Sequence, residues 1–222
     1  MTMTPDIAAR LMEIKSALPQ GVELTAVSKF HPAASIMEAY GAGQRAFGES
    51  RAQELQEKAA MLPDDIEWHF IGHLQTNKVR QVVAVADMIQ SVDSMRLLKA
   101  VNDAAVKAGR CVDILLQVHV AREETKTGFL PEEMEQAALE ALAMPGVRLR
   151  GVMGMASNTD DEERVRADFK AIRGCFDAIR LGAAAGQTCF DTVSMGMSHD
   201  RDIAIEQGST MVRIGSDIFG ER

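Results

Sequence analysis

Short runs rich in β-branched and aromatic residues alternate along the chain with longer runs whose apolar residues recur at helical spacing. The short runs predict eight strands, at 23–28, 46–48, 68–71, 88–92, 112–120, 148–153, 192–195 and 211–214. Helical spacing predicts helices at 33–42, 52–62, 74–86, 94–108, 131–143, 160–181 and 200–207, with an extra N-terminal helix at 6–18. A helix after each strand is typical of a parallel sheet.

The strand count predicts the fold class. Eight βα units favour closure into a single (β/α)8 TIM-type barrel spanning 1–222. Little chain follows the eighth strand, so we expect the helix at 6–18 to cover the place of a full eighth helix. The alternative is an open doubly wound sheet, although no GxGxxG motif follows the first strand.

Composition narrows the class of protein. A net charge of −8 is unfavourable for nucleic-acid binding, which needs a basic surface. Residues 1–10 lack the apolar core of a secretory signal, and no apolar run is long enough to span a membrane. The three cysteines, Cys111, Cys175 and Cys189, form no CxxC pair and are typical of a reducing compartment. We therefore expect a cytoplasmic protein.

Lys29 follows the first strand at the end where barrel enzymes place functional groups. Alternation puts Thr25, Val27 and Lys29 on one face of the strand. If that face points inward, the Lys29 amine lies at the barrel mouth, where desolvation lowers its pKa and makes it nucleophilic. A solvated lysine at a strand end is the alternative.

A second cluster follows the last two strands. Residues 196–200 read GMSHD and open a helix, and 213–216 read RIGS. The loops after strands seven and eight are the usual phosphate site of such barrels, and glycine, hydroxyl groups and backbone N–H groups suit a phosphate. Strands one and eight are neighbours in a closed barrel, and pyridoxal 5′-phosphate (PLP) is one ligand that joins a Schiff-base lysine to a phosphate site. Ordinary turn chemistry is the alternative.

Arg213 shares a strand face with Met211, so we expect it inside the barrel. A buried guanidinium needs partners. Three hypotheses remain open: it binds the phosphate, it donates to the pyridine nitrogen of PLP, or it forms a structural ion pair with an acidic side chain.

Two other segments carry weaker indications. The segment 68–78 has polar groups that could line the mouth, but His69 could equally be a core residue, and His69 and His73 alone are a poor metal site. Lys126 lies in a long loop after the fifth strand, where a solvated lysine is the default.

Together these motifs resemble the pyridoxal phosphate homeostasis proteins over nearly the whole chain. The resemblance rests on AVSK at 26–29, FGE at 47–49, KTG at 126–128, GVMGM at 151–155 and SMGMS at 194–198, together with 68–78 and 209–221. It implies the barrel of a fold-type III PLP protein such as alanine racemase. It also implies Lys29 as the Schiff-base lysine, Ser198, Gly215 and Ser216 as phosphate contacts, and Arg213 near the pyridine nitrogen.

The chain departs from the family pattern at three positions. His31 stands where the family commonly has an accessory lysine, and Ser50 replaces an asparagine, so any contact from that asparagine is in doubt. Ser216 replaces a more usual threonine but keeps the hydroxyl group.

The resemblance implies a PLP carrier and regulator, without efficient catalysis, that acts in cofactor and amino-acid homeostasis. The alternative on the same cofactor is an amino-acid racemase, which needs an acid–base group on each face of the substrate. The single tyrosine, Tyr40, falls within a predicted helix. A Schiff-base aldolase without PLP is a third class. We expect a monomer whose partners are PLP and apo-enzymes that receive it.

Overall fold

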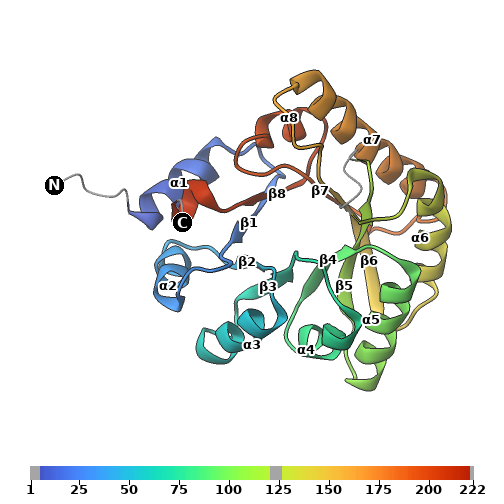
Figure 1. The fold of residues 1–222 in the computed structure, drawn as a ribbon, viewed down its shortest axis with the longest axis horizontal. Helices are drawn as coiled ribbons and strands as arrows, with labels where there is room; N and C mark the ends of the chain where they lie inside the picture. Colours follow the sequence, from blue (N-terminus) through green and yellow to red (C-terminus); the bar gives the residue numbers. More distant parts are fainter. Residues whose placement is uncertain (1–5, 121–126, 221–222) are drawn as a thin grey trace.

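Eight parallel strands form a closed barrel, in chain order, in the computed structural model, which describes residues 6–120 and 127–220 (Figure 1). β1 pairs with both β2 and β8, which closes the sheet. The barrel prediction is therefore confirmed and the open sheet is wrong. The strands are β1 Glu23–Val27, β2 Ala46–Glu49, β3 Glu67–Phe70, β4 Met88–Val92, β5 Val112–Val118, β6 Val147–Gly154, β7 Thr192–Ser194 and β8 Met211–Ile214.

Helices surround the barrel as an outer layer (Figure 1). They are α1 Ile7–Ala17, α2 Ala33–Gly41, α3 Ala52–Met61, α4 Val79–Val83, α5 Met95–Lys107, α6 Met134–Leu142, α7 Glu162–Leu181, α8 Arg201–Glu206 and α9 Ser216–Phe219, with 3₁₀ turns η1 Thr76–Lys78 and η2 Pro131–Glu133. The helix predicted at 74–86 is wrong in extent, because only η1 and the short α4 form there. The apolar residues of that segment are mostly valines, whose β-branched side chains weaken a helix.

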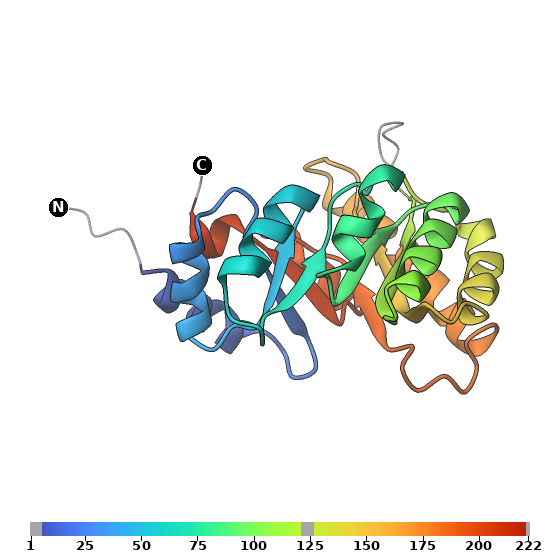
Figure 2. The same ribbon diagram turned by 90° about the horizontal axis from the view of Figure 1, so that it is seen from below.

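The extra N-terminal helix covers the gap left by the short C-terminal one. α9 is a single turn after β8, and α1 contacts both α9 and α2. Figure 1 and Figure 2 both show α1 beside α9, on the side of the barrel where β8 meets β1. The expectation that residues 6–18 take the place of a full eighth helix is confirmed.

The barrel interior differs from the apolar core between the strands and the helices. A small buried cluster of Met88, Leu115, Met153 and Met211 is separate from the main core. Buried polar residues are its neighbours on the same inward faces, since Gln90 Nε2 donates to Met211 Sδ at 3.3 Å. The interior therefore contains a polar network as well as a packed core.

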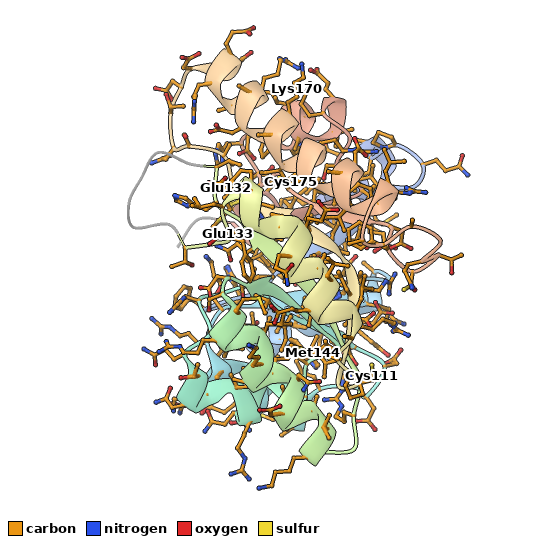
Figure 3. All side chains as sticks on the ribbon, turned by 90° about the vertical axis from the view of Figure 1, so that its right-hand side faces the viewer. Cys111, Glu132, Glu133, Met144, Lys170 and Cys175 are labelled. Carbon is orange, nitrogen blue, oxygen red and sulfur yellow. The ribbon has the colours of Figure 1, made fainter. Side chains whose placement is uncertain are left out.

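The three cysteines are free thiols. In Figure 3, which faces α5, α6 and α7, Cys111 lies apart from Cys175 on α7. Within the described residues, no helix combines the length and apolar character that a membrane span requires.

Candidate cofactor site

A cavity of about 600 Å³ opens at the end of the barrel where the strands end and the βα loops begin. Its volume is in the range of roughly 300–1,000 Å³ that is typical of small-molecule sites. All five residues predicted from the sequence line it, although they come from segments almost 190 positions apart. The lining residues are Val27, Lys29, His31, Ser50, Ile71, Met155, Met197, Ser198, His199, Arg213, Gly215, Ser216 and Gly220.

Lys29 reaches this cavity because of strand alternation. Thr25 points into the barrel, where its hydroxyl lies 3.2 Å from a ring nitrogen of His69. Val27, two residues further on, lines the cavity with Lys29, which is half-buried. The next residue, Phe30, has φ of 69°, a left-handed conformation that is uncommon for a bulky residue. The chain therefore turns sharply immediately after Lys29.

A buried charge network holds that turn from behind. The Glu54 carboxylate accepts from the Phe30 backbone N–H at 2.6 Å. Lys58 donates to Glu54 and Glu49 at 2.7 Å each, and to the Ser28 carbonyl at 2.9 Å. Burial raises the pKa of Glu49, while hydrogen bonds from Lys58 and Ser28 oppose that rise. The residues on both sides of the predicted lysine are thus tied to the side chain of Lys58.

Two hydroxyl groups meet at the cavity, on the loops that follow β7 and β8. Ser216 Oγ donates to Ser198 Oγ at 3.1 Å, which joins the loops after β7 and β8. Gly215 lies between β8 and α9, and a Cβ atom there would lie 3.3 Å from both Cβ and the carbonyl oxygen of Val27. Glycine therefore lets this loop lie close against β1, with both hydroxyls on the cavity.

The loop after β7 has its own supports. Gly196 adopts φ of +96°, and a Cβ atom there would lie 2.6 Å from the Cβ of Ala204. Its carbonyl accepts from the Arg213 backbone N–H at 3.0 Å. The buried Asp200 carboxylate accepts from the Met197 backbone N–H at 2.6 Å. Ser198 is therefore presented by a loop whose shape is determined locally.

Arg213 is 5% exposed and binds neutral acceptors. Its Nη1 donates to the carbonyl and hydroxyl oxygens of Ser194 at 2.8 and 2.7 Å, and its Nη2 donates to the Gly154 carbonyl at 3.1 Å. Burial lowers the pKa of Arg213 to about 10, against the opposing charge of Asp200. No carboxylate among the described residues forms an ion pair with it, so the structural ion-pair hypothesis is wrong. Its positive charge stays available to the cavity.

The histidines of the segment 68–78 and Lys126 were weaker indications of a functional role. His69 lies inside the barrel, 4% exposed, and does not line the mouth. His73 is exposed and its Nδ1 lies 3.1 Å from an oxygen of Asp93. Across residues 6–120 and 127–220, no group of three or more His, Cys, Asp and Glu side chains forms a candidate metal site. Lys126 lies outside the described residues.

Several residues that shape the site belong to no motif that marks them as functional in the sequence. Ser194 and Gln90, which connect to Arg213 in the barrel interior, are the main examples. Alternation from Thr192 predicts an inward Ser194, by the same argument that places Arg213 inside. The cavity also includes His31 and Ser50, two positions where the chain departs from the family pattern.

The donor set fits PLP. The cofactor has an aldehyde that reacts with an amine, a phosphate that accepts hydrogen bonds, and an apolar ring with one basic nitrogen. The cavity offers the Lys29 amine, the hydroxyls of Ser198 and Ser216, and the Arg213 guanidinium, and its apolar lining includes Val27, Ile71, Met155 and Met197. These groups lie on one cavity, as a single ligand with those three functions requires.

Comparisons with known proteins agree with this arrangement. A family model described as alanine racemase, N-terminal domain, matches residues 4–222. The pyridoxal phosphate homeostasis protein of Pasteurella multocida is 36% identical over 231 residues, covering 100% of this chain and 98% of the relative. The structure of PipY from Synechococcus elongatus with PLP bound has a TM-score of 0.88 at 38% identity, covering 96% of this chain and 100% of PipY. An alanine racemase from Clostridium difficile has a TM-score of 0.79, but at 16% identity it shows the fold alone.

The chain thus belongs to the family of barrels described as the alanine racemase N-terminal domain. Within that family, it belongs to the pyridoxal phosphate homeostasis proteins.

Proposed function

We propose that this protein binds PLP as a Schiff base on Lys29 and acts in PLP homeostasis, holding the cofactor and releasing it to apo-enzymes. One observation carries the proposal: Lys29, Arg213 and the paired hydroxyls of Ser198 and Ser216 line the same cavity. The name of the Pasteurella relative and the PLP-bound PipY structure give independent support.

Each residue has a role that follows from its chemistry. Lys29 would hold the cofactor covalently, because its amine can condense with the aldehyde as one water molecule leaves, and the reverse reaction with water would release it. Ser198 and Ser216 donate to the phosphate, and Gly215 lets the backbone approach it. Arg213 would hold the pyridine nitrogen, the role that the family resemblance implies. Because a guanidinium donates hydrogen bonds and does not accept a proton there, that nitrogen stays unprotonated and the ring is a poor electron sink.

The racemase alternative has less support. A racemase needs a second acid–base group opposite the lysine. Tyr40 is on α2, at the outside of the barrel, and its hydroxyl donates to Asp65 at 2.6 Å, so it does not line the cavity. Likeness to the racemases at 16% identity supports the barrel and not the reaction.

We also propose the domain extent, the location and the oligomeric state of the protein. A single-barrel domain over 1–222, a cytoplasmic location and a monomer agree with the acidic composition and with a cavity formed by one chain. The apo-enzymes that receive the cofactor belong to the same proposal.

The test combines a spectrum with two assays on the PLP-loaded protein. We expect visible or near-ultraviolet absorbance from the bound cofactor, transfer of PLP to a PLP-dependent apo-enzyme, and no efficient formation of D-amino acid, keto acid or amine from L-amino acids. Turnover of about 1 s⁻¹ or faster would contradict the carrier function and favour the racemase. A protein that takes up no PLP but cleaves a sugar phosphate would instead be a Schiff-base aldolase.

A further inference from the structure

A chain of hydrogen bonds crosses the barrel interior from Arg213 to His69. Arg213 Nη1 donates to Ser194 Oγ at 2.7 Å, and Ser194 Oγ donates to Gln90 Oε1 at 2.7 Å. Gln90 Nε2 lies 2.9 Å from His69 Nδ1. The four side chains come from β8, β7, β4 and β3, and none is more than 5% exposed.

In this network, the chemistry of the neighbouring groups determines which atom donates and which accepts in each hydrogen bond. A guanidinium only donates, so Ser194 Oγ accepts from Arg213 and its own proton needs another acceptor, which Gln90 Oε1 supplies. The amide orientation of Gln90 is determined independently, because its Nε2 also faces the thioether sulfur of Met211, an acceptor. His69 Nδ1 therefore accepts, and the ring carries its proton on Nε2.

The two ends of the network lie on different cavities. Arg213 lines the cavity of about 600 Å³ that also contains Lys29, called here the mouth cavity. His69 lines a second cavity of about 330 Å³ at the opposite end of the barrel, with Glu67 and Asp113 from the first residues of β3 and the start of β5. Burial keeps the pKa of His69 at about 4, so the ring is neutral at neutral pH, as an accepting Nδ1 requires.

We infer that Ser194, Gln90 and His69 are positioning residues for Arg213, which they hold with its guanidinium on the mouth cavity. The inference rests on the proposed function, because Arg213 acts there on bound PLP. Removing the Gln90 acceptor frees the Ser194 hydroxyl to rotate, and Arg213 loses a defined partner. The three residues themselves do not line the mouth cavity, so they act on PLP only through Arg213.

The first measurement uses the protein without added PLP. Nitrogen-15 NMR of His69 should show a neutral imidazole protonated at Nε2, and Gln90→Leu should change its nitrogen shifts. A ring protonated at Nδ1 in the wild-type protein would overturn the inference. This readout does not depend on the cofactor.

The second measurement follows PLP affinity and the absorbance of bound PLP in Ser194→Ala and Gln90→Leu. Each should shift the absorbance in the direction that Arg213→Leu shifts it, and should weaken affinity roughly two- to tenfold, as for loss of one hydrogen bond. Ser16→Ala on α1 is the matched control, because its hydroxyl bonds the Glu13 carbonyl and contacts neither the network nor the cavity; it should leave both quantities unchanged. Ser194→Ala removes one oxygen atom, so it keeps the test open even if Gln90→Leu folds poorly.

A double-mutant cycle separates positioning from a general structural effect. In the Arg213→Leu background, Ser194→Ala should change PLP affinity and absorbance no further. Effects that add fully in the double variant, or single variants that match the wild type, would overturn the inference. A wild-type protein that takes up no PLP would refute the proposed function before any variant is measured, so the two failures are distinguishable.

Discussion

The hydroxyl of Ser216 donates to the hydroxyl of Ser198 across 3.1 Å, although the two residues belong to the loops after different strands. Both hydroxyls line the mouth cavity. Ser216 Oγ also lies 3.4 Å from a carboxylate oxygen of Asp217, so a phosphate would compete with a weak existing bond. This pair is the structural basis of the proposed phosphate site.

Replacing either serine should therefore weaken binding of PLP more than binding of pyridoxal, which lacks the phosphate. Each of Ser198→Ala and Ser216→Ala should raise the dissociation constant for PLP about tenfold, since a hydrogen bond to a charged group contributes about 1.5 kcal/mol or more. Equilibrium dialysis with both ligands measures this. Ser16→Ala on α1, where the hydroxyl bonds the Glu13 carbonyl, is the matched control. Equal losses for PLP and pyridoxal would place the phosphate elsewhere.

Lys58→Met should destabilise the protein strongly. Its amine is buried with the Glu49 carboxylate, and removing one partner of a buried pair typically costs about 3–5 kcal/mol. Chemical unfolding gives the change in stability. Lys99→Met is the control, because that exposed lysine lies 3.7 Å from Glu140 and contributes about 1 kcal/mol at most. The Glu49→Gln/Lys58→Met double variant should recover part of the lost stability. Equal stabilities for Lys58→Met and Lys99→Met would contradict the account.

Stability should fall with acid because of His69. Burial lowers its pKa from 6.5 to about 4, with Asp113 opposing the shift and Arg150 adding to it. The unfolded chain binds the proton more readily, so stability is full above pH 6.5 and decreases as pH falls towards 4, by about 2 kcal/mol at pH 5. His69→Gln should show a shallower loss between pH 7 and pH 5. An identical pH profile for the two proteins would mean that His69 is not the group responsible.

Much of the barrel and the candidate site follows from periodicity in the sequence. Strand alternation and the pairing of β1 with β8 together bring Lys29 and Arg213 to the same cavity, and both were predictable from the sequence. The shortened helix at 74–86 was not predictable in the same way, since its apolar spacing is helical while its valines favour extended structure.

Contacts across the barrel are harder to predict. Ser194 and Gln90 are more than 100 positions apart, and their bond depends on how far each strand is staggered around the barrel. The left-handed turn at Phe30 is also invisible in the sequence, because it is held by Glu54 from the following βα unit. Both features are tertiary effects that no local pattern encodes.

The covalent attachment of PLP to Lys29 is the central claim, and reduction with borohydride followed by peptide mass mapping tests it most directly. The reagent converts a C=N bond to a stable amine, so the modified residue keeps the mass of the reduced cofactor. We predict that the wild-type protein and Lys99→Ala carry it on Lys29, and that Lys29→Ala folds but carries none. The same yield of labelled protein from Lys29→Ala, with the mass on Lys126 or any other lysine, would contradict the account.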